Sequence, residues 1–137
     1  MASDTQLLQQ AVFAHLAADS ALGALLGGDK VHDRPPDGAA MPYVTLGMTR
    51  AFDAGTASEK AQEHLFTLHA WSSTGGRKQT MQILEAIRLR MDSLPVASGA
   101  MRIVSVAAQG EDITHDPDMR AFHGTLRLRA LTEPITV

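Results

Sequence analysis

The segment HAWSSTGGRKQT, residues 69–80, places two glycines before Arg77 and Lys78 and could therefore contact a phosphate. A P-loop has a lysine directly after its second glycine and a serine or threonine directly after that lysine. Here Arg77 intervenes and Thr80 is displaced, so the spacing does not match this phosphate-binding motif. Serine and threonine hydroxyls can cap the first turn of a helix. We therefore interpret the segment as the joint between a strand and a helix.

The six histidines could serve as metal ligands or as general bases. His64 and His69 are five residues apart, so on an extended strand their side chains point to opposite faces and cannot bind one metal ion. His32 and His115 each precede an aspartate, but no candidate nucleophile stands at a recognisable position in the sequence. We expect the histidines to have surface or packing roles.

An acidic run, made of Glu111, Asp112, Asp116 and Asp118, could bind a divalent cation. It lacks the glycine at the sixth position and the final glutamate of an EF-hand loop, so a solvated connection is the favoured interpretation. The chain has no cysteine, which excludes a disulfide, a thiol nucleophile and a cysteine-based zinc site. The sequence thus predicts no catalytic residue, no cofactor and no metal, and a protein that is not an enzyme.

The length and composition are those of an ordinary folded protein. The 137 residues suit a single domain over positions 1–137, and 45% of them are hydrophobic while 20% are charged. A net charge of -3 argues against a surface that holds nucleic acid by neutralising many phosphates. No segment has the pattern of a signal peptide or an apolar run that could cross a bilayer, so we expect a soluble protein without membrane contact.

Apolar residues at helical spacing predict two main helices and one short helical turn. The first helix is expected after a cap at Ser3 or Asp4. A short helical turn covers residues 20–26, and the glycines at 27–28 end it. The second main helix is expected over residues 80–94, where apolar side chains form one stripe. Both main helices therefore have a face to bury against a core.

Alternating or continuous apolar residues predict four long strands, at residues 42–52, 61–71, 101–108 and 121–131. The proline-rich bend at residues 30–41 allows a short edge strand at most. Residues 53–60 are small or charged and form either a hairpin tip or a mobile loop. Residues 109–119 are polar and rich in turn formers, so we expect them to connect the last two strands.

The last strand alternates cleanly, with one packed face and one wet face. The residues expected on the wet face are His123, Thr125, Arg127 and Arg129. Arg127 and Arg129 could form a salt-bridged face, an anion site or a subunit interface, and we favour the interface because arginine is enriched at such surfaces. Together the elements predict an α+β fold, a mostly antiparallel sheet of about four long strands with two main helices packed on one face.

Several segments, in their order and spacing, resemble the tail-terminator or tail-completion family. The resemblance covers nearly the whole chain and is carried by LLQQAVFAHLAAD, SALGALLGG, PYVTLG, HAWSSTGG and DMRAFHGTLRLRA. Members of this family come from long, non-contractile-tailed phages and from phage-like gene transfer agents. PYVTLG and the joint that ends in Gly76 are the most specific of these segments. The resemblance is to a family of structural proteins, so it brings no catalytic residue to this chain.

The resemblance implies a homo-oligomer, expected as a hexameric ring, that caps the tail tube, ends its polymerisation and joins it to a head-side connector or stopper protein. DNA would pass through the lumen without sequence-specific binding. The protein would assemble in the cytoplasm of the producing bacterium and then lie at the head-proximal end of the tail. Alternatives are a head-tail connector, a minor tail component, or a domain that binds a small ligand near His64, His69 and Trp71.

A ring needs two different complementary surfaces on each subunit, because its contacts are head-to-tail. The candidate surfaces are the bend at residues 30–41, the loop at residues 53–60 and the arginine face of the last strand. The candidate interface residues are Arg34, Asp37, Arg50, Asp53, Thr56, Glu59, Lys60, Arg127 and Arg129.

Overall fold

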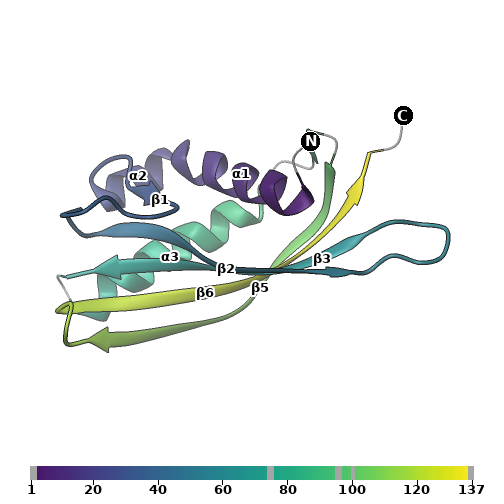
Figure 1. Ribbon diagram of the computed structural model, residues 1–137. Coiled ribbons are helices and arrows are strands. Elements are labelled where there is room, and N and C mark those ends of the chain that lie inside the picture. Colours follow the sequence, from purple (N-terminus) through teal and green to yellow (C-terminus); the bar gives the residue numbers. More distant parts are fainter. Residues whose placement is uncertain (1–2, 74–75, 95–96, 100, 136–137) are drawn as a thin grey trace.

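The computed structural model describes residues 3–73, 76–94, 97–99 and 101–135 and shows an α+β fold. Its elements are α1 (Asp4–Ala17), α2 (Ser20–Leu26), β1 (Val31–His32), β2 (Tyr43–Asp53), β3 (Gln62–Ser72), α3 (Arg77–Met91), β4 (Ala97–Ser98), β5 (Met101–Asp116) and β6 (Ala121–Pro134). The strands form one sheet in the order β1-β2-β3-β6-β5-β4, antiparallel except for the β1–β2 pair. The helices lie on one face of this sheet (Figure 1), which confirms the predicted class.

Local capping explains where the first two helices begin and end. Ser3 Oγ accepts a hydrogen bond from the Gln6 backbone N–H at 3.2 Å, while Gln6 Oε1 accepts one from the Ser3 N–H at 3.0 Å. This reciprocal capping box satisfies two N–H groups that have no partner inside the helix. Asp19 caps α2 in a similar way through Leu22, and Gly27 ends α2 at a φ of 78°. Both expected boundaries are confirmed.

The third helix begins at Arg77, three residues earlier than the sequence predicts. Its N-cap is Gly76 with a φ of 61°, and no side chain caps the helix, so the expected serine or threonine cap is wrong. Thr80 is instead fully buried inside the first turn. The Ser72 hydroxyl donates to Gln79 Oε1 and ties the strand end to the helix. Of the predicted joint, residues 74 and 75 lie outside the described residues.

The polar segment after residue 108 belongs to a strand, so the predicted connection over residues 109–119 is wrong. β5 continues through this segment to Asp116, and only residues 117–120 form the turn. Gly110 pairs with Arg127 and Asp116 pairs with Ala121, so β6 supplies the hydrogen-bonding partner along this length. A strand near the edge of an antiparallel sheet can keep polar side chains in water, and pairing therefore overrides the turn-forming composition.

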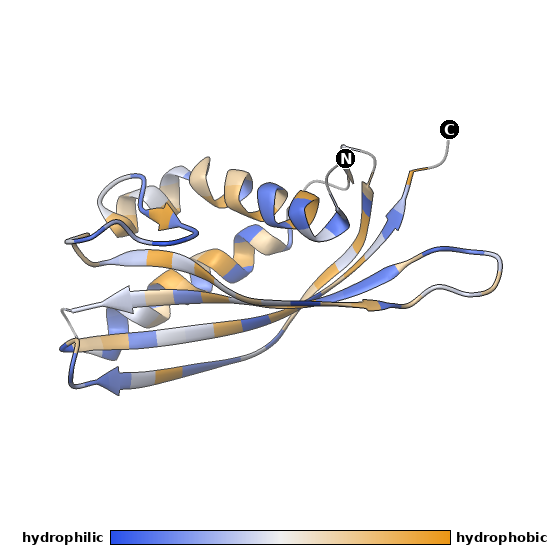
Figure 2. Ribbon diagram, viewed as in Figure 1, coloured by the Kyte–Doolittle hydropathy of each residue, from blue (hydrophilic) through white to orange (hydrophobic). Residues whose placement is uncertain are grey.

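A single layer of apolar side chains fills the space between the helices and the sheet. The helices contribute Leu8, Val12, Leu16, Leu22, Leu26, Ile83, Leu84 and Ile87, and the sheet contributes Val44, Phe66, Leu68, Ala70, Leu126, Leu128 and Ala130. Hydrophobic and hydrophilic bands alternate along the strands (Figure 2), as the predicted alternation of β6 requires. None of the helices in the described residues is long and apolar enough to cross a membrane.

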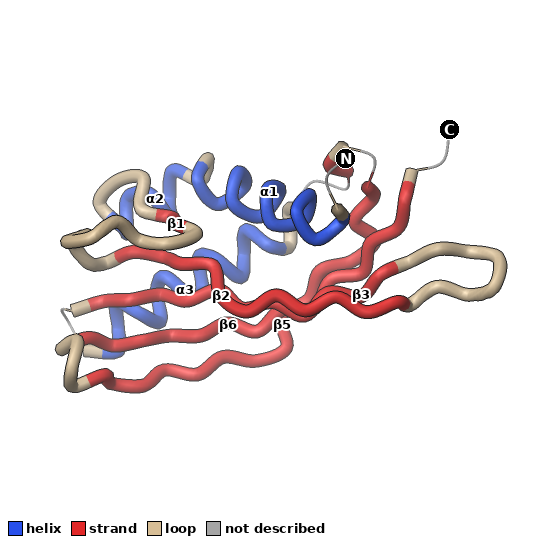
Figure 3. The backbone as a smooth tube through the Cα atoms, viewed as in Figure 1, coloured by secondary structure: helices blue, strands red, loops and turns tan. Residues whose placement is uncertain are grey.

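The β2–β3 hairpin projects beyond the helices as a long ribbon that ends in a loop (Figures 1 and 3). Residues 49–60 are all exposed, and the loop is closed by hydrogen bonds from Ala54 N–H to the Ala61 oxygen and from Thr56 N–H to the Glu59 oxygen. We call residues 49–62 the hairpin arm. Of the two interpretations offered for residues 53–60, the structure supports the hairpin tip.

Candidate assembly surface

The sheet face opposite the helices carries polar side chains in place of a second apolar layer. We call it the open face. Its central members, on β2, β3, β6 and β5, are Thr45, Thr67, His69, Trp71, Asp112, His123, Thr125, Arg127 and Arg129. Most of these side chains are half-buried and bonded to one another, so the open face is ordered without being covered by another element.

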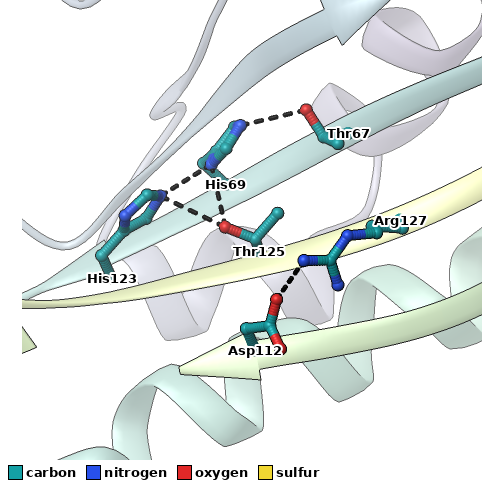
Figure 4. A network of polar contacts seen from close by, with 6 residues as sticks. All are labelled: Thr67, His69, Asp112, His123, Thr125 and Arg127. Carbon is teal, nitrogen blue, oxygen red and sulfur yellow. Dashed lines mark hydrogen bonds and ion pairs between the residues drawn. The ribbon is translucent and has the colours of Figure 1, made fainter. Parts of the chain in front are cut away.

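Two histidines meet at the centre of the open face (Figure 4). His69 Nδ1 lies 2.6 Å from His123 Nε2, and Thr125 Oγ1 lies 3.2 Å and 3.4 Å from these two nitrogens. Thr67 Oγ1 contacts the other nitrogen of His69 at 3.0 Å. A hydrogen bond between two imidazoles needs one donor and one acceptor, so it does not form when both rings carry a second proton. The contact is therefore incompatible with two charged rings.

Trp71 stacks on the same cluster. Its ring lies 3.9 Å from the His123 ring at an angle of 4°, and its Nε1–H donates to Thr45 Oγ1 at 3.2 Å. Gly47 makes room beside the cluster, because a Cβ there would lie 2.2 Å from both Thr67 Oγ1 and His69 Nε2. Packing at this distance is not tolerated without movement, so the glycine is part of the site.

His64 lies on the other face of β3, fully buried, with Nε2 bonded to Thr132 Oγ1 at 2.8 Å. The expected separation of His64 from His69 is confirmed. The ligand site considered around His64, His69 and Trp71 is therefore not formed as a unit, since only the last two share a face. Within the described residues, no group of three or more His, Cys, Asp or Glu side chains could hold a metal ion.

Burial sets the protonation of these histidines. It lowers the pKa of His69, and the charge that His123 can carry lowers it further. Burial also lowers the pKa of His123 against a smaller opposing effect of Asp116. The pKa of His64 is lowered by burial against a smaller opposing effect of Asp4. In each case the uncharged ring is favoured in the folded protein.

These shifts predict a fold that loses stability in mild acid. A lowered histidine pKa means that the unfolded chain binds protons more tightly, so the contribution is complete above about pH 6.5 and is lost as pH falls toward the folded values. We expect thermal unfolding to shift to lower temperature between about pH 7.5 and 5.5. The double substitution His69→Asn with His123→Asn should weaken this dependence, whereas His115→Asn on the exposed part of β5 should leave it. An unchanged slope in the double variant would contradict the assignment.

The two arginines of β6 are both paired within the chain. Arg127 forms an ion pair with Asp112 of β5, and Arg129 Nη2 lies 3.1 Å from Glu63 Oε2 of β3. Of the three interpretations of this arginine face, a salt-bridged face is present. A subunit interface stays a prediction, because an exposed pair of this kind adds little stability and remains able to contact another chain.

The other candidate residues lie at two further places. Arg34 and Asp37 belong to the exposed bend before β2, at the end of that strand where β1 pairs with Val44. The remaining five lie on the hairpin arm at the other end, as Arg50, Asp53, Thr56, Glu59 and Lys60. The structure therefore does not bring the whole set together (Figure 1). The histidine and tryptophan cluster, in contrast, was missed as a unit.

Comparison with known proteins identifies the family of this chain. The family model of tail completion protein gp17 matches residues 10–133, almost the whole described chain. The chain belongs to this family. Tail completion proteins are structural components of phage tails and not enzymes, which confirms the resemblance and the absence of an enzymatic role inferred from the sequence.

Two solved structures have the same fold as this chain. A chain of the virion of a native gene transfer agent particle superposes with a TM-score of 0.86 at 24% identity, covering 96% of this tail completion protein and 99% of that chain. The gp17 protein of bacteriophage SPP1 gives a TM-score of 0.62 at 19% identity, with 97% and 94% covered. At these identities the likeness concerns the fold alone. No curated protein matched the sequence.

Proposed function

We propose that this tail completion protein forms a ring that caps the tail tube, ends its polymerisation and joins it to a head-side connector or stopper protein. The observation that carries the proposal is the family match over residues 10–133. The ring is a homo-oligomer, with six copies as the expected number, and each chain acts as one domain. It assembles in the cytoplasm of the producing cell and then occupies the head-proximal end of the tail.

The distribution of candidate surfaces supports a ring. Each subunit of a ring uses two different surfaces, and the chain presents exposed sets at the bend, on the hairpin arm and on the arginine face. DNA passes through the lumen, and a net charge of -3 suits a conduit because the chain has no excess of positive charge to retain phosphates. The loop at residues 53–60, the tip of the hairpin arm, is the candidate contact with a stacked ring, since it is polar and extends away from the core.

The test is the length of tails in particles made without this chain, measured by electron microscopy. We expect overlong tubes without heads, and normal tails after the chain is supplied from a plasmid. Tails of normal length joined to heads in the absence of the chain would refute the terminator role. The measurement addresses function directly and does not depend on which residues form the contacts.

The arginine face makes a separate prediction about subunit contacts. Alanine at both Arg127 and Arg129 should lower the mass of the assembled protein in solution and reduce the number of complete particles, because two exposed guanidinium groups are lost from the open face. Arg88→Ala is the matched control, since Arg88 pairs with Glu85 on α3, away from that face. If the double variant assembles like the control, these arginines do not support the interface.

A further inference from the structure

Both edges of the sheet are left largely open. β1 pairs only with Val44 and Thr45 of β2, and β4 pairs only with Met101 and Arg102 of β5. In the described part of the chain, the outer edges of β2 and β5 therefore have no backbone partner beyond these short pairings. An unpaired strand edge presents N–H and C=O groups that can bind another strand.

Each open edge contains a regular stretch of at least five residues. In β2 it is Thr49–Asp53, which follows a register shift, and in β5 it is Gly110–Asp116, which also follows a shift. Neither stretch contains the proline or lysine that commonly protects a strand edge from pairing. The two stretches are of similar length and lie on opposite sides of the sheet, so they can serve as the two halves of a head-to-tail contact.

Strand direction fits such a contact. β2 runs antiparallel to β3, β3 to β6, and β6 to β5, so β2 and β5 run in opposite directions at the two edges. A second copy placed beside the first with its strands in the same directions would bring its β2 antiparallel to β5. The helices of both copies would then lie on the same side of a continuous sheet.

Charge and shape select one register for this pairing. Arg50 pairs with Leu65, and Asp112 pairs with Thr125, which puts Arg50 and Asp112 on the open face. Arg50 makes no ion pair among the described residues, and the Asp112 carboxylate has room for a second donor beside Arg127. With Arg50 opposite Asp112 of a neighbour, no like charges face each other along the two regular stretches.

The same register places an aromatic ring over a glycine. Phe52, 43% exposed, would face Gly110 of the neighbour, where a Cβ would meet only Arg127 Nη1 at 4.0 Å. Aromatic side chains that cover a strand glycine stabilise cross-strand pairs. Ala51 would face Glu111 on the helix side of the sheet. The open space at Gly110 and the exposed ring of Phe52 are thus complementary.

We propose that the β2 edge of the hairpin arm pairs antiparallel with the β5 edge of a second copy of this chain, with Arg50 opposite Asp112. This inference rests on the proposed ring and specifies its subunit contact. The contact joins the six-stranded sheets of neighbouring subunits into one sheet that follows the ring.

The contact cannot form within one chain. Ala51 aligns through His64 and Ala130 with Val106, three strands away, or about 14 Å across the sheet. Glu111 lies five residues farther along β5, about 17 Å along the strand. A disulfide requires Cα atoms roughly 4.4–6.8 Å apart, so a bond between positions 51 and 111 reports a contact between two copies.

Because the natural chain has no cysteine, the test uses the double variant Ala51→Cys with Glu111→Cys, produced in place of the natural chain in cells that assemble particles. After oxidation of purified particles, a non-reducing gel should show a ladder of multiples of the chain mass. The matched control is Ala51→Cys with Thr114→Cys, whose second position points to the other face in this register, and it should give no ladder. Assembled particles without the first ladder, or with equal ladders in both variants, would overturn the pairing.

A second measurement tests the pairing of β2 with β5 of a neighbour if the cysteine variants do not assemble. Arg50→Asp should reduce complete particles more than about tenfold, because like charges then face each other across the contact. Adding Asp112→Asn to the same chain should restore part of the loss, because it removes the repulsion without placing a second cation beside Arg127, and no restoration would overturn the pairing. Normal tail length in particles without the chain would instead refute the terminator function, and the ladder would still report whether the copies pair.

Discussion

Replacing Leu84 with alanine is expected to lower the free energy of unfolding by about 3 kcal/mol. Leu84 is fully buried where α3 packs on the sheet, and a Cβ at Gly124 of β6 would lie 2.8 Å from its Cδ1. This close packing leaves little room for the backbone to relax into the space that the substitution opens. The lost contacts and the remaining cavity therefore both contribute to the cost.

The measurement is urea unfolding of the purified protein, followed by its secondary structure. Leu89→Ala is the matched control, because Leu89 lies on the same helix and is 60% exposed. We expect that control to change stability by less than about 0.5 kcal/mol. Equal losses in the two variants would show that helix propensity, and not burial, sets the result.

Shortening the hairpin arm is expected to prevent the heads of the particles from joining to their tails, while the fold of the protein remains intact. The change replaces residues 55–60 with Asn-Gly, so that a two-residue turn connects Ala54 and Ala61, which already share a hydrogen bond. Residues 55–60 are all exposed and bury nothing, so thermal stability should be unchanged. Loss of joined particles would follow from the loss of the contact with the partner ring.

Electron microscopy of particles, with counting of free heads and free tails, measures this effect. A variant that keeps six residues in the loop but makes all of them glycine or serine separates the length of the arm from the chemistry of Thr56, Glu59 and Lys60. If the shortened arm gives normal particles, the tip does not contact the stacked partner. If the side-chain variant fails together with the shortened arm, those polar groups carry the contact, whereas failure of the shortened arm alone would assign the effect to the length of the loop.

Local patterns predicted the elements that depend on neighbours in sequence. The capping box of Ser3 and Gln6 needs only four consecutive residues, and the stop at Gly27 needs only one glycine in a left-handed conformation. The alternation of residue types along β6 likewise distinguishes its packed face from its exposed face. These features follow from short-range geometry, so sequence reasoning was sufficient for them.

Features that depend on register were beyond this reasoning. His69 and His123 are 54 positions apart, and only the pairing of β3 with β6 brings their rings together. The polar part of β5 was missed for the same reason, because β6 supplies the partner that turn-forming residues lack on their own. Alternation showed which way each of these side chains points but not which neighbour it meets.

The hairpin arm has a consequence for how the free subunit fluctuates. Residues 49–60 are all exposed, and this part of β2 has a neighbouring strand on one side only, so the segment can open locally while the core stays folded. Its amide hydrogens therefore exchange with solvent through local opening, whereas those of β3 near Leu68 require opening of the core. A strand that pairs with the arm in the particle suppresses this exchange, so protection of the arm records assembly without any rearrangement of the core.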